Sequence, residues 1–253
     1  MAKIKRAMVL AAGKGTRLGE LTKATPKPLI DLGGTTPLFR ILKGLENAGI
    51  EEVVINCHWR AEKVIDSVEA WRSQNVFQFK MILSYEEALL ETAGGINKAA
   101  HHFKGEPFVI ANGDIVWGEG FAQFVTQLAQ KYDAEQMDFL LALTPVDHDR
   151  KENGDFRFYK DGRVDFLDEG EISEISYCGL SIVHPRVLAD VEQGYLPLMS
   201  LWREAIAEKT MYGYKADFPW VDMGTPEGLQ KARDVIKYEN GLPAKVLKFE
   251  SHG

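Results

Sequence analysis

Hydrophobic residues along the chain form two kinds of segment that alternate with each other. Short runs that are rich in β-branched or aromatic residues occupy positions 7–12, 53–55, 77–83, 107–111, 139–143 and 180–183. Longer stretches with apolar residues at helical spacing lie between them, at positions 38–48, 61–71, 95–100 and 121–132. Continuously apolar strands separated by amphipathic helices are typical of a parallel sheet with helices on both faces. The pattern therefore predicts a doubly wound α/β unit over residues 1–145.

The pattern changes after Pro145. Residues 155–183 contain strand-like pieces and a turn signal at 160–163, with no long helix between them. This texture predicts a small antiparallel lobe. Helical spacing returns at 198–207 and at 226–238, and no Ser-, Pro- or Gly-rich linker separates the parts. We therefore expect a single domain over residues 1–253, with internal boundaries near 145 and 225 and a loose polar tail.

Composition narrows the possible partners. The chain has 253 residues, of which 45% are hydrophobic and 26% charged, and this excludes a disordered chain. With 37 acidic and 30 basic residues the net charge is −7, which argues against an extended nucleic-acid contact. No apolar run approaches the roughly 20 residues that span a bilayer, and the first one is too short for a signal peptide. We expect a cytoplasmic monomer with neither nucleic acid nor membrane as partner.

Three loops follow predicted strands and carry the candidate chemistry. They are residues 11–18 (AAGKGTRL), 111–114 (ANGD) and 220–225 (WVDMGT). Ligands of an open parallel sheet bind beyond the carboxyl ends of its strands, so these loops should converge on one cleft.

The first loop has the features of a phosphate site. Gly13 and Gly15 allow close backbone approach and positive φ, so that successive N–H groups can surround a phosphate. Arg17 adds a permanent charge with a fork that suits phosphate oxygens, and Lys27 is fixed between two prolines. A glycine-rich turn can also be only a tight turn. A Walker motif is excluded because Gly15 stands where Ser or Thr is required, and the glycine spacing fits a dinucleotide fingerprint poorly.

The other two loops each supply a carboxylate. Asp114 follows an apolar run, where the alternative is an Asx turn. Asp222 precedes a helix whose better N-cap is Thr225, with Pro226 in the first helical position, so the aspartate has no evident structural task. Two carboxylates without a His or Cys cluster suit a hard cation such as Mg²⁺. The two cysteines, Cys57 and Cys178, are expected to be buried and inert.

The motifs LAAGKGTRL, TPKPL, LETAGG, NGD and WVDMGT occur in this order between about residues 6 and 235. As an ordered set they resemble the sugar-1-phosphate nucleotidyltransferases. The resemblance implies a Rossmann-like α/β fold with a mostly parallel mixed sheet. It implies an enzyme that joins a nucleoside triphosphate to a sugar 1-phosphate, releasing pyrophosphate. It also implies a nucleotide-binding part at about 1–145, a sugar-phosphate part at about 146–225 and a C-terminal helix and tail.

The resemblance assigns roles to residues that match the family motifs. The nucleotide would meet Leu10, Ala11, Ala12, Gly13, Gly15, Thr16, Arg17, Lys27, Glu86 and Thr92. Catalysis would rest on Arg17, Lys27, Asp114 and Asp222, and the two aspartates would bind Mg²⁺. The sugar-side candidates are Asn112, Gly154, Asp155 and Gly179.

Local features favour one subgroup of this family. Glu91 before Thr92, NGDIVW at 112–117, GDFRF at 154–158 and CGLSIVHP at 178–185 resemble the N-acetylmuramic acid 1-phosphate uridylyltransferases of cell-wall recycling. Mannose-1-phosphate guanylyltransferases are the first alternative, and the others are a glucose-1-phosphate thymidylyl- or uridylyltransferase and a non-catalytic nucleotide-binding relative. A carboxylate at Glu86 suits the two adjacent donors of guanine, but the uridylyltransferases also carry Glu there. Asp168-Glu169-Gly170 replaces the Glu-Lys-Pro of many relatives, so a sugar-phosphate lysine is missing.

Overall fold

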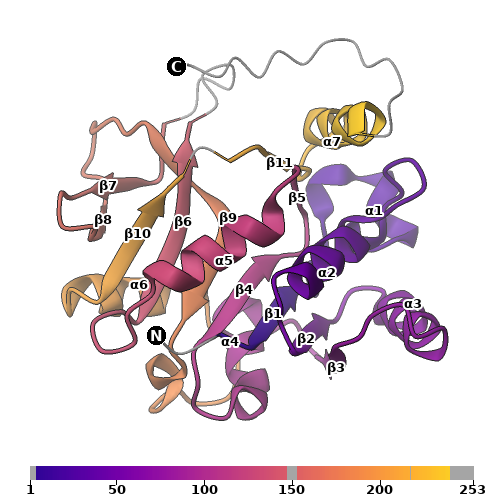
Figure 1. The fold of residues 1–253 in the computed structure, drawn as a ribbon, viewed down its shortest axis with the longest axis horizontal. Coiled ribbons are helices and arrows are strands. Elements are labelled where there is room, and N and C mark those ends of the chain that lie inside the picture. The colour runs from indigo at the N-terminus through magenta and orange to yellow at the C-terminus, as the bar shows by residue number, and fades with distance from the viewer. Residues whose placement is uncertain (1–3, 147–152, 217, 240–253) are drawn as a thin grey trace.

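A seven-stranded sheet forms the centre of the molecule in a computed structural model that describes residues 4–146, 153–216 and 218–239 (Figure 1). The strand order is β10-β6-β9-β4-β1-β2-β3. β9 runs antiparallel to both of its neighbours and the other pairs are parallel, which confirms the mostly parallel mixed sheet. The strands are β1 Arg6–Leu10, β2 Glu52–Cys57, β3 Lys80–Tyr85, β4 Phe108–Asn112, β6 Phe139–Pro145, β9 Ile175–Val183 and β10 Met211–Lys215.

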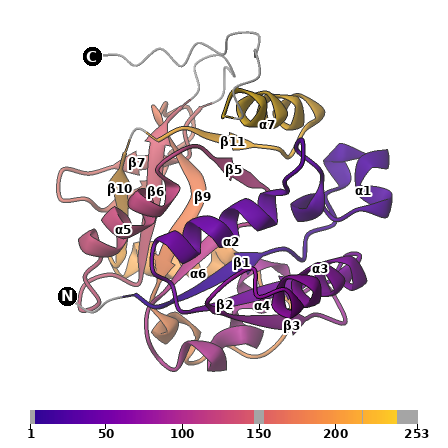
Figure 2. The ribbon, with the colours of Figure 1, turned by 45° about the vertical axis from the view of Figure 1, so that its right-hand side comes forward.

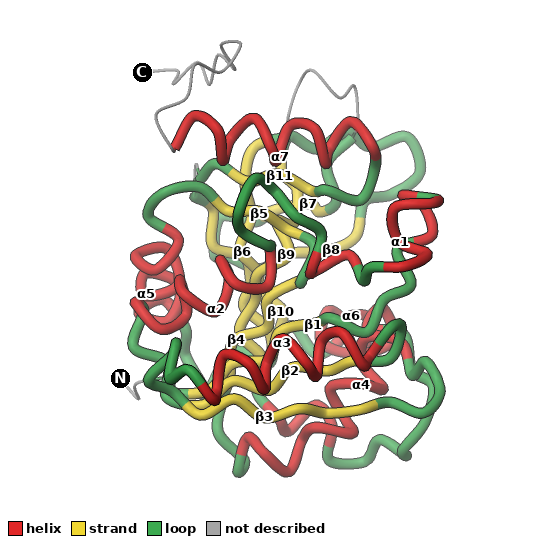
Figure 3. The backbone as a smooth tube through the Cα atoms, turned by 90° about the vertical axis from the view of Figure 1, so that its right-hand side faces the viewer, coloured by secondary structure: helices red, strands yellow, loops and turns green. Residues whose placement is uncertain are grey.

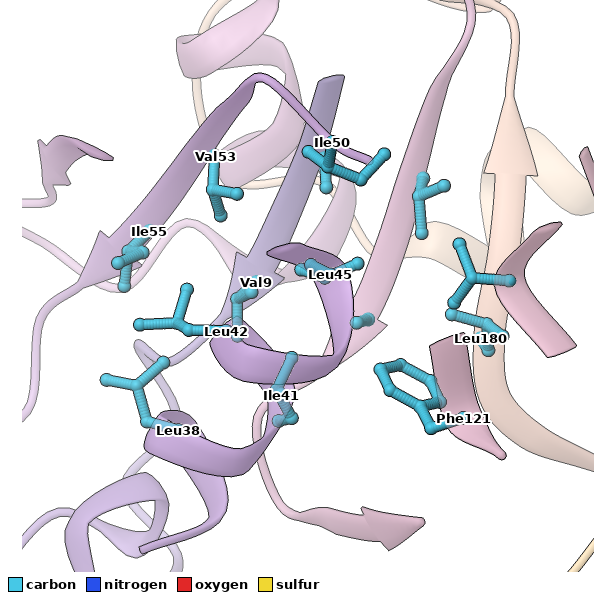
Figure 4. Close-up of a cluster of buried hydrophobic side chains, with 14 of the residues drawn as sticks. Val9, Leu38, Ile41, Leu42, Leu45, Ile50, Val53, Ile55, Phe121 and Leu180 are labelled. Atoms are coloured by element: carbon cyan, nitrogen blue, oxygen red, sulfur yellow. The ribbon is translucent and has the colours of Figure 1, made fainter. Parts of the chain in front are cut away.

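Helices cover both faces of this sheet (Figures 1 and 2). One face packs against α2 (Pro37–Asn47), α3 (Ala61–Ser73) and α5 (Phe121–Lys131), and the other against α4 (Glu91–Ala99) and α6 (Leu198–Ala207). Successive residues of a strand point to opposite faces, and β1 shows the consequence. Val9 packs in the α2 cluster, as Figure 4 shows, whereas Met8 belongs to the α4 and α6 cluster. Met8 and Val9 are both fully buried, so β1 is covered on both of its faces, which explains its continuous apolar run.

Two smaller antiparallel pairs lie beyond the main sheet. β5 (Ile115–Trp117) pairs with β11 (Trp220–Asp222), and α7 (Pro226–Glu239) packs on them through a third apolar cluster (Figure 3). β7 (Phe156–Phe158) and β8 (Val164–Phe166) form the hairpin of the predicted antiparallel lobe. The remaining short helices are η1 Thr16–Leu18, α1 Glu20–Ala24, η2 Lys27–Leu29, η3 Ala100–Phe103 and η5 Pro185–Leu188.

The predicted elements differ from the observed ones in a few places. The third strand begins at Lys80 rather than at 77, because Phe77 packs against the aromatic rings of Phe39 and Trp71 instead of joining the ladder. α4 begins at Glu91 rather than at 95, and β10 was not predicted. No helix within the described ranges is long and apolar enough to cross a membrane. The expected loose tail lies outside the described residues.

Candidate active site

A cavity of about 330 Å³ opens where β1, β2 and β4 end. Its lining includes most of the predicted nucleotide-binding residues, together with both residues of the 112–114 turn that were predicted as site residues. Gly15, Thr16 and Arg17 are outside the lining, as are Asp222 and three of the sugar-side candidates. The lining residues are Leu10, Ala11, Ala12, Gly13, Lys14, Lys27, Pro28, Asn56, Glu86, Leu89, Glu91, Thr92, Asn112 and Asp114.

Lys27 connects the glycine loop to the first acid. Its side chain is only 9% exposed, and its Nζ donates to Asp114 Oδ2 at 2.6 Å. Gly15 has φ +64°, and a Cβ placed there would lie 3.2 Å from Lys27 Cε. The Lys27 stem therefore runs along the glycine loop, which Thr22 Oγ1 secures by donating to Gly15 O at 3.0 Å. The structure brings the loop, the ammonium and Asp114 together.

The pairing of β5 with β11 brings the second acid to the first. Asp222 lies opposite Ile115 in the ladder, and Met223 N–H donates to Asp114 O at 3.2 Å. The two aspartates, 108 positions apart in sequence, therefore occupy neighbouring strand ends. Asp222 Oδ1 accepts from Gly224 N at 2.7 Å, so this aspartate also has a structural task that the sequence did not predict. The last residue of β11 thus completes the acidic pair.

Arg17 reaches the same place from the glycine loop. A Cβ placed at Gly224 would lie 2.8 Å from a guanidinium nitrogen of Arg17 and 2.9 Å from Asp222 Oδ1. Arg17 and Asp222 therefore flank Gly224, and a side chain at this position would displace one of them. Of the four residues predicted for catalysis, Lys27 and Asp114 form an ion pair in the cavity lining, and Arg17 and Asp222 lie beside it on either side of Gly224.

The donor set of this edge fits Mg²⁺. This ion uses one or two carboxylates and keeps several of its waters, and Asp114 and Asp222 offer two. No group of three or more His, Cys, Asp or Glu side chains suited to a metal occurs in the part of the chain that the structure describes. A Mg²⁺ ion held by these two carboxylates would take its remaining ligands from water or substrate oxygens.

A chain of hydrogen bonds holds another part of the cavity lining, and one of its members, Asn56, was not predicted. Ala11 N donates to Asn56 Oδ1 at 2.7 Å, and Asn56 Nδ2 donates to Glu86 Oε1 at 2.7 Å. Leu90 N donates to the second carboxylate oxygen, Glu86 Oε2, at 3.2 Å. Asn56 was detectable as a polar residue that directly continues the apolar segment 53–55, since a buried amide needs partners.

The sugar-side candidates divide into two groups. Asn112 lines the cavity, and Gly179, at φ +79°, is close enough that a Cβ there would lie 3.1 Å from Asn112 Nδ2. Gly154 instead packs against the carbonyl groups of Ser173 and Ile175, so a side chain would not fit there. Asp155 Oδ2 accepts from Tyr177 N at 2.8 Å. Gly154 and Asp155 therefore attach the lobe to β9 and are not brought to the cavity lining.

Neither cysteine has the properties of a nucleophile. Burial, and then the nearby Glu86 carboxylate, raises the pKa of Cys57 to about 11. Burial raises the pKa of Cys178 to about 12. Both side chains are buried, so the expectation that they are inert agrees with their surroundings.

Comparison with known proteins gives the site its context. Residues 6–238 match the family model described as nucleotidyl transferase. An N-acetylmuramate alpha-1-phosphate uridylyltransferase from Caulobacter vibrioides is 33% identical over 88% of this chain and 93% of its own length. A mannose-1-phosphate guanyltransferase from Kluyveromyces lactis is 24% identical over 97% of this chain and 69% of its own length. A UDP-glucose pyrophosphorylase structure from Acinetobacter baumanii has a TM-score of 0.75 at 16% identity, covering 93% and 94% of the two chains.

Proposed function

The chain belongs to the nucleotidyl transferase family, and from this premise we propose that it transfers the uridylyl group of UTP to N-acetylmuramic acid 1-phosphate. The relationship to known uridylyl- and guanylyltransferases makes it a sugar-1-phosphate nucleotidyltransferase. The finer assignment of sugar and base rests on the relative from Caulobacter vibrioides, which the chain matches over nearly its full length.

The observation that supports the chemistry is the convergence of two cations and two acids at the cavity edge, where Lys27 pairs with Asp114 and Arg17 and Asp222 flank Gly224. An oxygen of the sugar phosphate would attack the α-phosphorus, forming a new P–O bond. The bond from that phosphorus to the bridging oxygen would break, and pyrophosphate would leave with the electron pair. A phosphate monoester has its second pKa near 6, so the nucleophile needs no general base at pH 7. This agrees with a cavity lining that contains no His among the described residues.

The residues of the edge have distinct tasks in this proposal. Arg17 and Lys27 would hold the phosphates and offset the charge that develops on the leaving group. Asp114 and Asp222 would hold Mg²⁺, which when bound neutralises phosphate charge. Lys27 donates to Asp114 in this structure, so an incoming triphosphate that attracts the ammonium would also free a carboxylate oxygen. Catalysis would then depend on positioning and charge neutralisation.

Transfer of a guanylyl group to mannose 1-phosphate is the second candidate, because the relative from Kluyveromyces lactis matches over 97% of this chain. Glu86 does not strengthen this candidate. A carboxylate could accept from guanine, but both Glu86 oxygens already accept hydrogen bonds from within the protein.

A pyrophosphate-release assay with Mg²⁺ tests the proposal. The purified protein is given each of the four nucleoside triphosphates with a panel of sugar 1-phosphates, and products are identified by mass. We expect UTP with N-acetylmuramic acid 1-phosphate to give the highest kcat/KM. Higher activity with GTP and mannose 1-phosphate would select the second candidate. No product with any pair would contradict both, and Asp114→Asn serves as the inactive control.

A further inference from the structure

We call the hydrogen-bond chain through Ala11, Asn56, Glu86 and Leu90 the cavity floor. A backbone N–H donor at each of its ends fixes the direction of the hydrogen bonds. Ala11 N–H lies at one end, in the loop after β1, and Leu90 N–H lies at the other, immediately before α4. A backbone N–H can only donate. The two side chains between them, Asn56 and Glu86, must therefore present an acceptor at each end.

This requirement fixes the chemistry of both side chains. Asn56 has to turn its oxygen to Ala11, which leaves its amide nitrogen facing Glu86. Residue 86 then receives one hydrogen bond from Asn56 and a second from Leu90, so it needs two acceptor atoms. A carboxylate provides two, whereas the amide of Gln provides one. The network explains the acid at position 86 without any ligand.

Burial shows that the network is an internal support. Glu86 is 0% exposed and Asn56 is 3% exposed, although both contribute to the cavity lining. The carboxylate lies at the N-terminal end of α4, where the helix dipole favours a negative charge. Gly95 of the neighbouring helix makes room for this carboxylate, because a Cβ there would lie 2.6 Å from Glu86 Oε1.

The network joins two segments that contribute to the cavity lining, residues 10–13 and residues 89–92, which we call its two walls. Each wall contains one of the terminal N–H groups, that of Ala11 or that of Leu90. We propose that Asn56 and Glu86 are positioning residues that set the separation of these walls, and that Glu86 does not select the base. This inference rests on the proposed nucleotide site and specifies how that site is held.

Reversal of one hydrogen bond provides the test. Glu86→Gln leaves a donor facing a donor at one of its two partners, and Asn56→Asp places two carboxylates where Asn56 and Glu86 bond at 2.7 Å. In the double variant N56D/E86Q, the carboxylate introduced at position 56 can accept from Ala11 and from the introduced side-chain amide at position 86. The oxygen of that amide can in turn accept from Leu90. All connections return, with the charge moved from position 86 to position 56.

Nucleotide titration and hydrogen exchange are the measurements. Each single variant is expected to bind UTP at least about tenfold more weakly, with faster exchange of the Ala11 and Leu90 amides. N56D/E86Q should bind UTP within about threefold of wild type, restore the protection of both amides and keep the wild-type ratio of UTP to GTP affinity. Glu87→Gln, an exposed carboxylate next in sequence, is the matched control and should change neither.

Opposite outcomes would overturn the inference. A double variant that is unfolded, or that remains tenfold weaker for UTP, would show that the network does not position the walls. A UTP-to-GTP ratio that changes more than tenfold in the double variant would show that Glu86 reads the base. If the single variants do not fold, the double variant decides alone. Wild type that binds UTP but transfers nothing contradicts the proposed function, while this binding test still applies.

Discussion

Polar groups are held differently in the cavity floor and in the β7–β8 lobe. In the floor, Glu86 is fully buried and each oxygen has one fixed donor from another element. In the lobe, Arg157 donates to Asp168 and Glu171, and it also lies 3.9 Å from Asp165. The side chain of Asp168 is 86% exposed. The donor and acceptor of each hydrogen bond are therefore fixed in the floor. In the lobe, another acid or water can replace any single partner of Arg157.

This difference suggests how the two parts tolerate change. A buried polar group that loses its partner retains its full desolvation penalty. Few combinations of residues at positions 56 and 86 therefore satisfy the hydrogen bonds of the floor. An exposed ion pair contributes little, and neighbouring acids can replace each other. The catalytic edge lies between these extremes, because Lys27 is nearly buried while the side chain of Asp114 is 29% exposed. Variants in each region should show effects of graded size.

The largest effect is expected at the catalytic edge. Asp114→Asn removes the charge that pairs with Lys27, and Lys27→Met keeps an apolar stem along Gly15 while removing the ammonium. Loss of one such charge contact typically costs about 100- to 1,000-fold in rate. Pyrophosphate release should fall by at least this factor, while the thermal midpoint shows that the fold persists. Turnover within tenfold of wild type would contradict the proposed roles.

The catalytic edge also shows how far sequence reasoning extended. The apolar runs predicted that the loops carrying Arg17, Lys27 and both aspartates would converge, and the structure brings these loops together, while the roles assigned to the four residues stay predictions. The strand pairing that joins the two acids was not predicted. It depends on the three-residue strands β5 and β11, which pair across 102 intervening residues and are too short to show a period.

The floor was harder to predict for a different reason. Glu86 was assigned to the nucleotide only through the family resemblance, and Asn56 was missed. Their relation depends on the register of β1 with β2 and on the position of Leu90, which are properties of the assembled sheet. Gly154 and Asp155 show the reverse case, since a motif placed them near the sugar and the structure places them against β9.

The next effect in size concerns Gly95→Ala. Inside a helix this change usually stabilises a protein by about 1 kcal/mol. Here the new Cβ would lie 2.6 Å from Glu86 Oε1 and 3.0 Å from Asn56 Nδ2, and overpacking of a buried site costs about 1–3 kcal/mol. We expect net destabilisation in urea unfolding and weaker UTP binding. Lys98→Ala on the same helix is the control. A Gly95→Ala protein more stable than wild type would show that Glu86 and Asn56 can shift to accommodate the methyl group.

A smaller effect is expected in the lobe. Hydrogen bonds from Arg157 to Glu171, Tyr159 and Asp168 raise the pKa of the guanidinium, which is already charged at any working pH. Arg157→Met should lower the thermal midpoint by about 2–4 °C, because the bidentate Arg157–Glu171 pair is partly buried, with side chains 28% and 30% exposed, and lies at the upper end of what surface ion pairs contribute. The difference should shrink in 1 M salt, where the screening length is about 3 Å. UTP affinity should not change; a tenfold loss would mean that the lobe and the floor are coupled.

The smallest effect on function is expected from thiol reagents. The pKa of Cys57 is raised to about 11, so at pH 8 only about 0.1% is thiolate, against about 10% for a thiol of pKa 9. Native protein should therefore react far more slowly than urea-unfolded protein and keep its activity. Because the folded pKa is the higher one, the stability from this neutral thiol is intact below pH 9 and is lost as pH rises towards 11. Rapid labelling at pH 8 with loss of UTP binding would show instead that β2 opens at Cys57, next to Asn56. The floor would then be less rigid than the lobe.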